Sequence, residues 1–138
     1  MGIDPAFGSS AFGIVITQRA DNQIQIMHAE EYEEVLKEAK SIRLEYEHDM
    51  DVVPVSFAAE HRSMLGNCKM LLEKDGGYIA INPKKFDKLI TSLRTAVEYN
   101  DGILDKEATS YDDIFDAFRL AMCYYRFTES RRRSLLSI

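Results

Sequence analysis

Carboxylates gather at two places in the sequence where they could hold a metal ion. Asp4 stands close to the N-terminus, at the end of a short stretch that could close a first strand. Asp112, Asp113 and Asp116 stand together near the other end of the chain. Asp113 and Asp116 are three residues apart, so a helix would place them on one face, with Asp112 close by. These acids are therefore candidates for a metal site, provided that the fold brings the two groups together.

Each group also has an ordinary structural interpretation. Asp-Pro pairs commonly open turns, so Asp4 can be a turn residue alone. Asp112 and Asp113 can stabilise the first turn of a helix, where the helix dipole favours acids. Asp116 lies at the rim of an apolar stripe, where a carboxylate is costly unless it is paired or holds a metal. A salt bridge to Arg119 would satisfy it, and the residue types leave both interpretations open.

The apolar pattern predicts the elements that would position these acids. Strands are predicted where β-branched or alternating apolar residues gather, near the N-terminus up to Ile3 and over 12–18, 23–28, 52–57 and 78–81. Helices are predicted where apolar residues recur every three or four positions, over 30–46, 58–72, 86–97 and 111–127, the last with Ser110 as its N-cap. A three-stranded antiparallel meander followed by helix–strand alternation predicts an α/β fold with a mixed sheet.

Length and composition predict one domain. The chain has 138 residues, of which 46% are hydrophobic, so a single core can form. We expect residues 1–127 to form the domain and residues 128–138 to form a basic tail. Cys68 and Cys123 lack the spacing of a zinc site and are expected to be buried, reduced thiols. The sequence shows neither a membrane-spanning apolar run nor a secretory signal, so we expect a soluble, cytoplasmic protein.

The charge distribution restricts how the chain could meet nucleic acid. The formal net charge is −6, which argues against a purely electrostatic DNA binder. It is compatible with a metal-dependent nuclease, because bound cations then meet the phosphates. Positive charge is concentrated in one segment, which makes four residues candidates for nucleic-acid contacts or for a solvated helix face: Lys84, Lys85, Lys88 and Arg94.

Three segments carry a resemblance to a known family. They are GIDPAFGSSAFGIVI at 2–16, VVPVSFAAEHRSMLGNCKMLLE at 52–73 and FDKLITSLRTAVEYNDGILDKEATSYDDIFDAFRLAM at 86–122. In this order they resemble the nuclease domain of terminase large subunits, the DNA-packaging motors of tailed viruses. The last segment contains an acidic helix of the form DDxxDA, and the first contains an aspartate before a small-residue loop.

The resemblance implies an RNase H-like fold and a hydrolase that cleaves double-stranded DNA. In such a site two Mg²⁺ or Mn²⁺ ions, about 4 Å apart, activate water and stabilise the leaving oxygen. Carried over by motif, Asp4 would be the first-strand ligand, and Asp113 and Asp116 would be the acids of the last helix. Asp112 is the alternative register within that helix.

The sequence departs from the family at two points. The family usually places a further acid at the end of a strand before the VPVSF segment, whereas here the helix predicted over 30–46 runs almost directly into Val52. One central strand is therefore expected to be missing, as after an internal deletion. The sequence also contains no GxxxxGK[ST] phosphate loop, so the ATPase motor that accompanies this domain is not expected in it.

Three functions follow as hypotheses. The first is a metal-dependent endonuclease of viral or proviral DNA packaging that works with other terminase or portal components. The second is a catalytically inactive or truncated relative that binds DNA or assembles, with a homodimer covering the surface exposed by the deletion. The third is a small α/β interaction module without a nucleic-acid role. The first two require Asp4 to converge with Asp113 and Asp116, and the third predicts that they lie apart.

Overall fold

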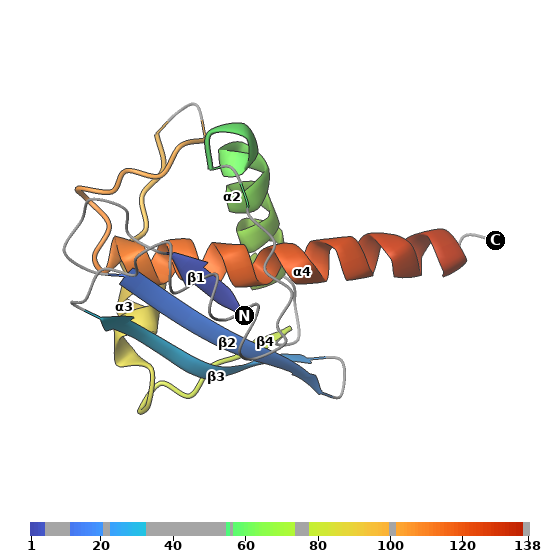
Figure 1. Cartoon of the computed structure of the whole chain (residues 1–138), viewed down its shortest axis with the longest axis horizontal. Helices are drawn as coiled ribbons and strands as arrows, with labels where there is room; N and C mark the ends of the chain where they lie inside the picture. Colours follow the sequence, from blue (N-terminus) through green and yellow to red (C-terminus); the bar gives the residue numbers. More distant parts are fainter. Residues whose placement is uncertain are drawn as a thin grey trace, which may run out of the picture.

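The computed structural model describes residues 1–4, 12–20, 23–32, 55, 57–73, 78–99 and 102–136. The strands in these residues form one four-stranded sheet in the order β1-β2-β3-β4. They are β1 (Gly2–Asp4), β2 (Phe12–Ala20), β3 (Gln23–Tyr32) and β4 (Ile79–Ala80). The helices of the described residues are α2 (Phe57–Glu73), α3 (Asp87–Thr95) and α4 (Asp112–Leu136), as Figure 1 shows.

The sheet is mixed, as the sequence predicts. β1 pairs with β2 and β2 with β3 in antiparallel fashion, which confirms the three-stranded meander. β4 then joins the far edge of β3 in parallel, through Ile24 opposite Ile79 and Gln25 opposite Ala80. The fold is therefore α/β, and the predicted helices over 58–72 and 86–97 correspond to α2 and α3.

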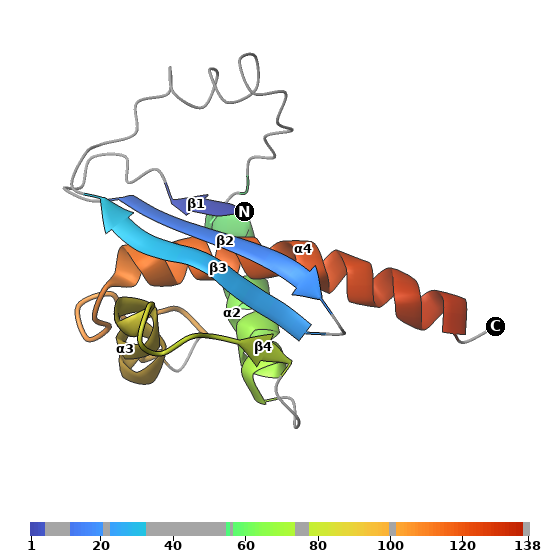
Figure 2. The same cartoon turned by 90° about the horizontal axis from the view of Figure 1, so that it is seen from below.

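Helix α4 is the centre of the molecule. It runs between the sheet and α2, and it contacts β1, β2, β3, α2 and α3 (Figure 1). The view from below shows the first three strands lying across its N-terminal half (Figure 2). Because neighbours cover it on several sides, all of its residues from Ile114 to Arg119 are buried. Ile114, Ala117 and Phe118 form one core with apolar residues of the sheet, α2 and α3, including Val15, Ile24, Leu71 and Leu89. Phe115 packs in a second cluster with Leu65 and Leu104.

Small residues let α4 approach the sheet closely. A Cβ atom on Gly13 would overlap the backbone carbonyl oxygen of Asp113, and one on Gly2 would overlap that of Ala117. On the helix side, Ala117 and Ala121 complete this contact. The backbone of the strands thus touches the backbone of α4, and no larger residue fits at either glycine without a shift of one element.

β3 extends further than the sequence predicts. Glu30 and Glu31 continue the ladder with β2, as partners of Ile14 and Gly13, and so does Tyr32 opposite Phe12. The prediction of a helix from Glu30 was wrong at these residues, because pairing with the long strand β2 outweighs the helical period that follows. The remainder of that predicted helix, 33–46, lies outside the described residues.

Two other boundaries differ from the predictions. Val55 is not in a strand and Phe57 begins α2, so the strand predicted over 52–57 was wrong at these positions, while 52–54 and 56 lie outside the described residues. α4 begins at Asp112 and runs to Leu136, through much of the segment predicted as a tail. None of the helices in the described part of the chain is long and apolar enough to cross a membrane.

Candidate functional site

Three acids from three elements converge around Gly13. In the sheet, Gly13 on β2 pairs with Asp4 on β1 and, on its other side, with Glu31 on β3. Directly opposed residues of antiparallel strands have Cα atoms about 4.5–5.5 Å apart. Gly13 also packs against the backbone of Asp113 at the start of α4. The backbones of Asp4 and Asp113 thus both lie next to Gly13, while the side chain of Asp4 lies outside those described.

Glu31 was not among the candidate residues predicted from the sequence, yet it lies next to Gly13 as well. Its Oε1 accepts a hydrogen bond from the backbone N–H of Ile114, 3.3 Å away. Partial burial raises the pKa of Glu31, the hydrogen bond from Ile114 opposes that rise, and the negative charge of Asp112 adds to it. Counting back from the hairpin turn between β2 and β3 would have placed an acid at 30 or 31 opposite Gly13. We call Asp4, Glu31, Asp112 and Asp113 the acidic site.

A lysine of the predicted basic segment lies at the edge of the acidic site. The Nζ of Lys88 on α3 is 2.7 Å from Oε1 of Glu30, the neighbour of Glu31. This ion pair holds the pKa of Glu30 below its usual value and raises the pKa of Lys88. Lys88 also lies over the ring of Tyr111, 6.0 Å from its centroid. One member of the basic segment therefore borders the acidic site directly.

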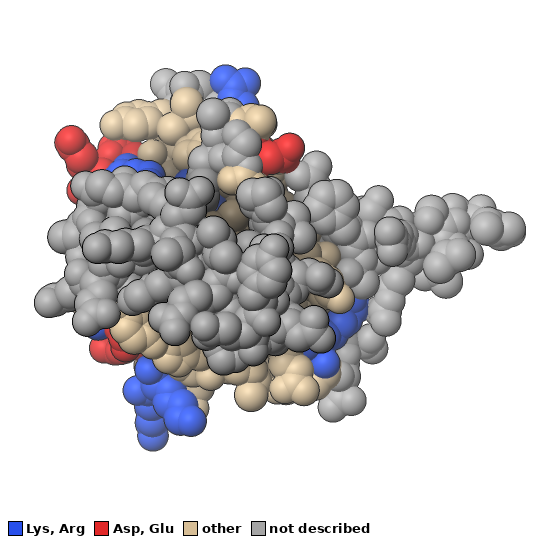
Figure 3. All heavy atoms as spheres, in the orientation of Figure 1, with Lys and Arg blue, Asp and Glu red and all other residues tan. Residues whose placement is uncertain are grey.

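The other members of that segment are exposed. Lys84 and Lys85 lie in the turn before α3, where their backbone N–H groups donate to Oδ1 of Asn82 at 3.0 and 3.4 Å. Blue side chains gather over this turn at the lower left of Figure 3. Arg94 lies in the last turn of α3, at the opposite end of that helix from Lys88. The segment thus presents positive charge along α3 rather than as one compact patch.

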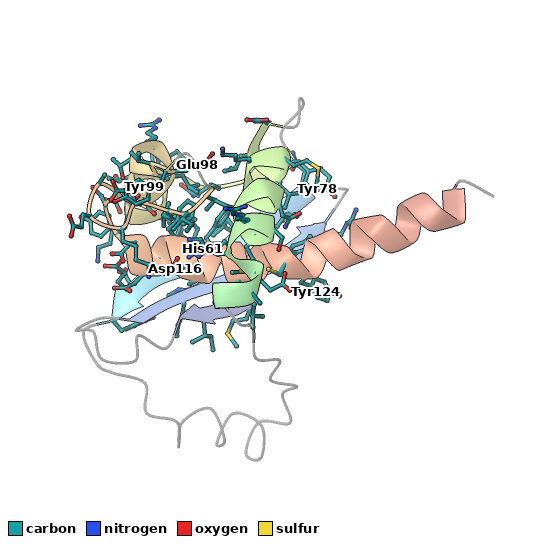
Figure 4. The ribbon with its side chains drawn as sticks, turned by 90° about the horizontal axis from the view of Figure 1, so that it is seen from above. His61, Tyr78, Glu98, Tyr99, Asp116 and Tyr124 are labelled. Carbon is teal, nitrogen blue, oxygen red and sulfur yellow. The ribbon has the colours of Figure 1, made fainter. Side chains whose placement is uncertain are left out.

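Asp116 has different surroundings from Asp113. Its Oδ1 is 2.6 Å from Nη2 of Arg119 and its Oδ2 is 2.7 Å from Nζ of Lys106. Asp116 is 1% exposed and Arg119 is fully buried, so the salt bridge considered from the sequence is present inside the core. Figure 4 shows Asp116 in the same region as His61, whose Nε2 accepts a hydrogen bond from the N–H of Leu104. Cations already contact both carboxylate oxygens of Asp116.

Among the described side chains, no group of three or more His, Cys, Asp and Glu residues is arranged to hold a metal ion. A site at Gly13 therefore depends on what Asp4 adds to Glu31 and the acids of α4. Cys68 and Cys123 form no disulfide: Cys68 is buried, which raises its thiol pKa, and Cys123 is half-buried. The thiol of Cys123 donates to the carbonyl oxygen of Arg119, 3.3 Å away and one turn back on α4. Cys123 lies near enough to Cys68 on α2 to add to the rise in its pKa.

A cavity of about 300 Å³ lies between α2, α3 and the segment that follows α3. Its walls are mainly apolar, with Leu65, Leu104 and Phe115 buried among them. Its one carboxylate, Glu98, is 2.6 Å from Nζ of Lys69. The thiol that lines this cavity, Cys68, is kept protonated by a pKa that burial raises, and the walls hold one carboxylate, so the acidic site is the better candidate for chemistry.

The neighbours Glu30 and Glu31 are expected to respond in opposite ways to removal of their charge. At pH 7, Glu30→Gln should lower the melting temperature and Glu31→Gln should raise it, each by roughly 1–3 °C, because solvent screens both partly exposed groups. The folded state lowers the pKa of Glu30 from 4.5, so its contribution is present above pH 4.5 and is lost as pH falls through the folded pKa.

For Glu31 the sign is reversed. The folded state raises its pKa from 4.5, so its destabilising effect grows as pH rises from 4.5 through the folded pKa and is absent at lower pH. Thermal melts of both variants and wild type at pH 3.5, 5 and 7 test this. Equal shifts of the melting temperature with the same sign at pH 7 would contradict the different surroundings of Glu30, which pairs with Lys88, and Glu31, which is partly buried against α4.

Comparisons of the chain with family models, curated proteins and solved structures found no match.

Proposed function

We propose that the chain is a divalent-metal-dependent DNA endonuclease domain with an RNase H-like arrangement of acids, of the terminase nuclease kind. The observation that carries the proposal is the alignment of Asp4, Gly13 and Glu31 across three strands, against the start of α4 at Asp113. Acids from separate elements that meet at one point are expensive unless a cation offsets their repulsion. Mg²⁺ and Mn²⁺ fit because they prefer carboxylate oxygens.

In this proposal Asp4 and Asp113 are metal ligands, with Asp112 as the alternative on the helix. Glu31 takes the place of the acid on the central strand that we expect the sequence to lack. Partial burial raises the pKa of Glu31, and the charge of Asp112 adds to this, so a cation bound there would favour its ionised form. Asp116 is assigned a structural role, since a metal ion would have to displace both Arg119 and Lys106.

The bound cations would orient water for attack on a phosphodiester and stabilise the leaving oxygen. The chain itself would contribute the carboxylates that hold the cations and the lysines that hold the DNA backbone. Lys88 borders the acidic site, and Lys84 and Lys85 extend the positive charge along the approach to α3. Double-stranded DNA would be guided by these residues and by the cations, despite the net charge of −6.

Plasmid cleavage with matched variants tests the proposal. Supercoiled plasmid is incubated with wild type, Glu31→Gln and Asp113→Asn over a titration of Mn²⁺ and Mg²⁺, while calorimetry measures metal binding. We expect cleavage only with metal, and a loss of at least about 100-fold in each variant, the effect of removing one electrostatic group from a catalytic site. Glu107→Gln, which changes an exposed acid away from the site, should cleave like wild type.

Asp4→Asn extends the same assay to the first strand and should also abolish cleavage. If the folded wild-type protein neither cleaves DNA nor binds metal at the acidic site, the nuclease hypothesis is wrong. Equal cleavage by wild type and Asp113→Asn would show that Asp113 is not needed for catalysis and that the catalytic site lies elsewhere in the protein. Circular dichroism of each variant separates a loss of activity from a loss of folding.

The burial of Asp116 favours a second candidate. One acid of the DDxxDA helix is already neutralised by Arg119 and Lys106, as in a chain that keeps the fold but not the metal site. This candidate is a non-catalytic relative that binds DNA or assembles with a second copy or with terminase and portal components inside the infected cell. It predicts DNA binding that is independent of divalent metal, and a dimer in light scattering.

A further inference from the structure

Tyr111 is held in an unusual backbone conformation. Its φ angle is 53°, and it is the only residue other than glycine with a positive φ in the described part of the chain. This left-handed region favours glycine and asparagine, so a bulky side chain there lowers stability. The carbonyl oxygen of Tyr111 accepts hydrogen bonds from the N–H of Phe115 at 3.2 Å and from Oγ of Ser92 at 3.3 Å. Tyr111 therefore precedes the first residue of α4 and occupies the N-cap position predicted for Ser110.

The side chain of Tyr111 does not recover this cost by burial. The residue is 41% exposed, and the continuous buried stretch of α4, which runs to Arg119, begins only at Ile114. The Nζ of Lys88 lies 6.0 Å from the ring centroid, on the side of α3. An exposed aromatic ring and an ammonium group thus lie together beside the acidic site, since Asp112 and Asp113 follow Tyr111 directly and Lys88 pairs with Glu30.

We propose that Tyr111 stacks on an unpaired base of a DNA strand while Lys88 contacts the phosphate next to that base. The site would then hold double-stranded DNA best where its bases are unstacked, such as frayed duplex ends, and would also hold single strands. This inference rests on the proposed function, because it takes DNA as the substrate of the acidic site. It adds Tyr111 as a residue that determines which form of DNA is bound.

Three physical points support this choice of ligand. Aromatic rings stack with every base, so a single tyrosine can bind a strand of any sequence. Lys88 is kept protonated by Glu30 and is 42% exposed, so it can reach a phosphate. The net charge of −6 makes non-specific attraction weak, and stacking supplies a contact that does not depend on charge. A fully paired duplex offers no base face except at its ends.

The sequence contains no tryptophan, which allows a direct test. Tyr111→Trp places a single tryptophan at the proposed stacking position, and Tyr124→Trp places one at a 69% exposed position further along α4 (Figure 4). Each variant is titrated with a twelve-thymidine oligonucleotide in Ca²⁺, which limits cleavage, and anisotropy of a labelled oligonucleotide measures binding in parallel. We expect saturable quenching at position 111 and none at 124. A blunt-ended hairpin duplex of matched length should quench less.

Affinity measurements complete the test. Tyr111→Asn should weaken binding of the oligonucleotide by about 5- to 100-fold, the effect of losing one base stack, and should raise the melting temperature because asparagine fits the backbone better. Tyr111→Trp should bind as wild type does. Lys88→Gln should weaken binding and reduce the salt dependence by about one phosphate contact.

Each outcome is decisive. Binding without quenching at position 111, or equal quenching at 111 and 124, overturns the stacking role. Undiminished affinity of Tyr111→Asn overturns it as well, and so does the absence of any oligonucleotide binding by wild type at low salt. Quenching at 111 combined with inactivity in the plasmid assay leaves the stacking role intact and removes the nuclease. A Tyr111→Asn variant that cleaves plasmid and binds the oligonucleotide as wild type does would keep the nuclease and remove the stacking role.

Discussion

Replacement of Arg119 by methionine is expected to lower the free energy of unfolding by about 3–5 kcal/mol. Arg119 is fully buried, and its partner Asp116 is 1% exposed. Methionine fills much of the same space but leaves the carboxylate inside the core without its nearest cation, which is 2.6 Å away in the wild type. Lys106 still reaches the other oxygen of Asp116, so the loss should fall towards the lower end of that range. Urea denaturation followed by circular dichroism measures it.

Two further variants separate the charge from the packing. Lys106→Met removes the more exposed of the two cations that contact Asp116. The side chain of Lys106 is 53% exposed, so this variant should lower the free energy of unfolding by less than about 1 kcal/mol. The double variant Arg119→Met/Asp116→Leu removes both buried charges and should recover a large part of the loss, because paired apolar residues need no desolvated partner. A single Arg119→Met variant as stable as wild type would show that Asp116 is not a buried anion.

Gly13→Ala is expected to destabilise the fold by about 1–3 kcal/mol and to disturb the acidic site. The added methyl group would overlap the carbonyl oxygen of Asp113, which is backbone and cannot rotate away. Either β2 or the start of α4 must shift. β2 lies between the strands that carry Asp4 and Glu31, and the start of α4 carries Asp112 and Asp113. The same variant should therefore lose metal-dependent cleavage even at temperatures where it stays folded.

Gly66→Ala is the matched control. Gly66 lies on an exposed face of α2, and nothing approaches within 4 Å of where its Cβ would be. Alanine is the better helix former, so this variant should gain about 0.4–1 kcal/mol. Thermal melts of the two variants should thus move in opposite directions. A Gly13→Ala variant that melts at the wild-type temperature would rule out the close contact between β2 and α4.

The sequence predicted the fold best where one apolar pattern runs through a whole element. β2, α2 and α3 were predicted within a few residues, β2 from its run of β-branched residues and the two helices from apolar positions that repeat every three to four residues. The end of β3 was missed because Glu30 and Glu31 also fit the polar face of a helix. Only pairing with β2, which is a contact between distant residues, decides between the two.

The candidate site shows the same limit. Spacing alone suggested that Asp113 and Asp116 share a role, since residues three apart on a helix are neighbours. α4, however, is buried on several sides, so two such neighbours meet different elements: the backbone of Asp113 touches the sheet, and Asp116 meets Lys106 and Arg119. Which neighbour covers which side of a buried helix depends on tertiary packing. The position of Glu31 next to the start of α4 depends on tertiary packing as well, so spacing along the sequence did not predict it.

The position of α4 also sets the order in which the chain can fold. Every strand of the described sheet precedes α4 in the sequence, yet the buried face of that sheet rests on it. During synthesis the hairpin of β2 and β3 emerges well before α4. The apolar face of the hairpin therefore stays exposed to water until α4 has been made. Folding of this core is therefore a late event on the ribosome. A pause in translation before α4 would prolong the time in which the uncovered sheet can associate with other chains.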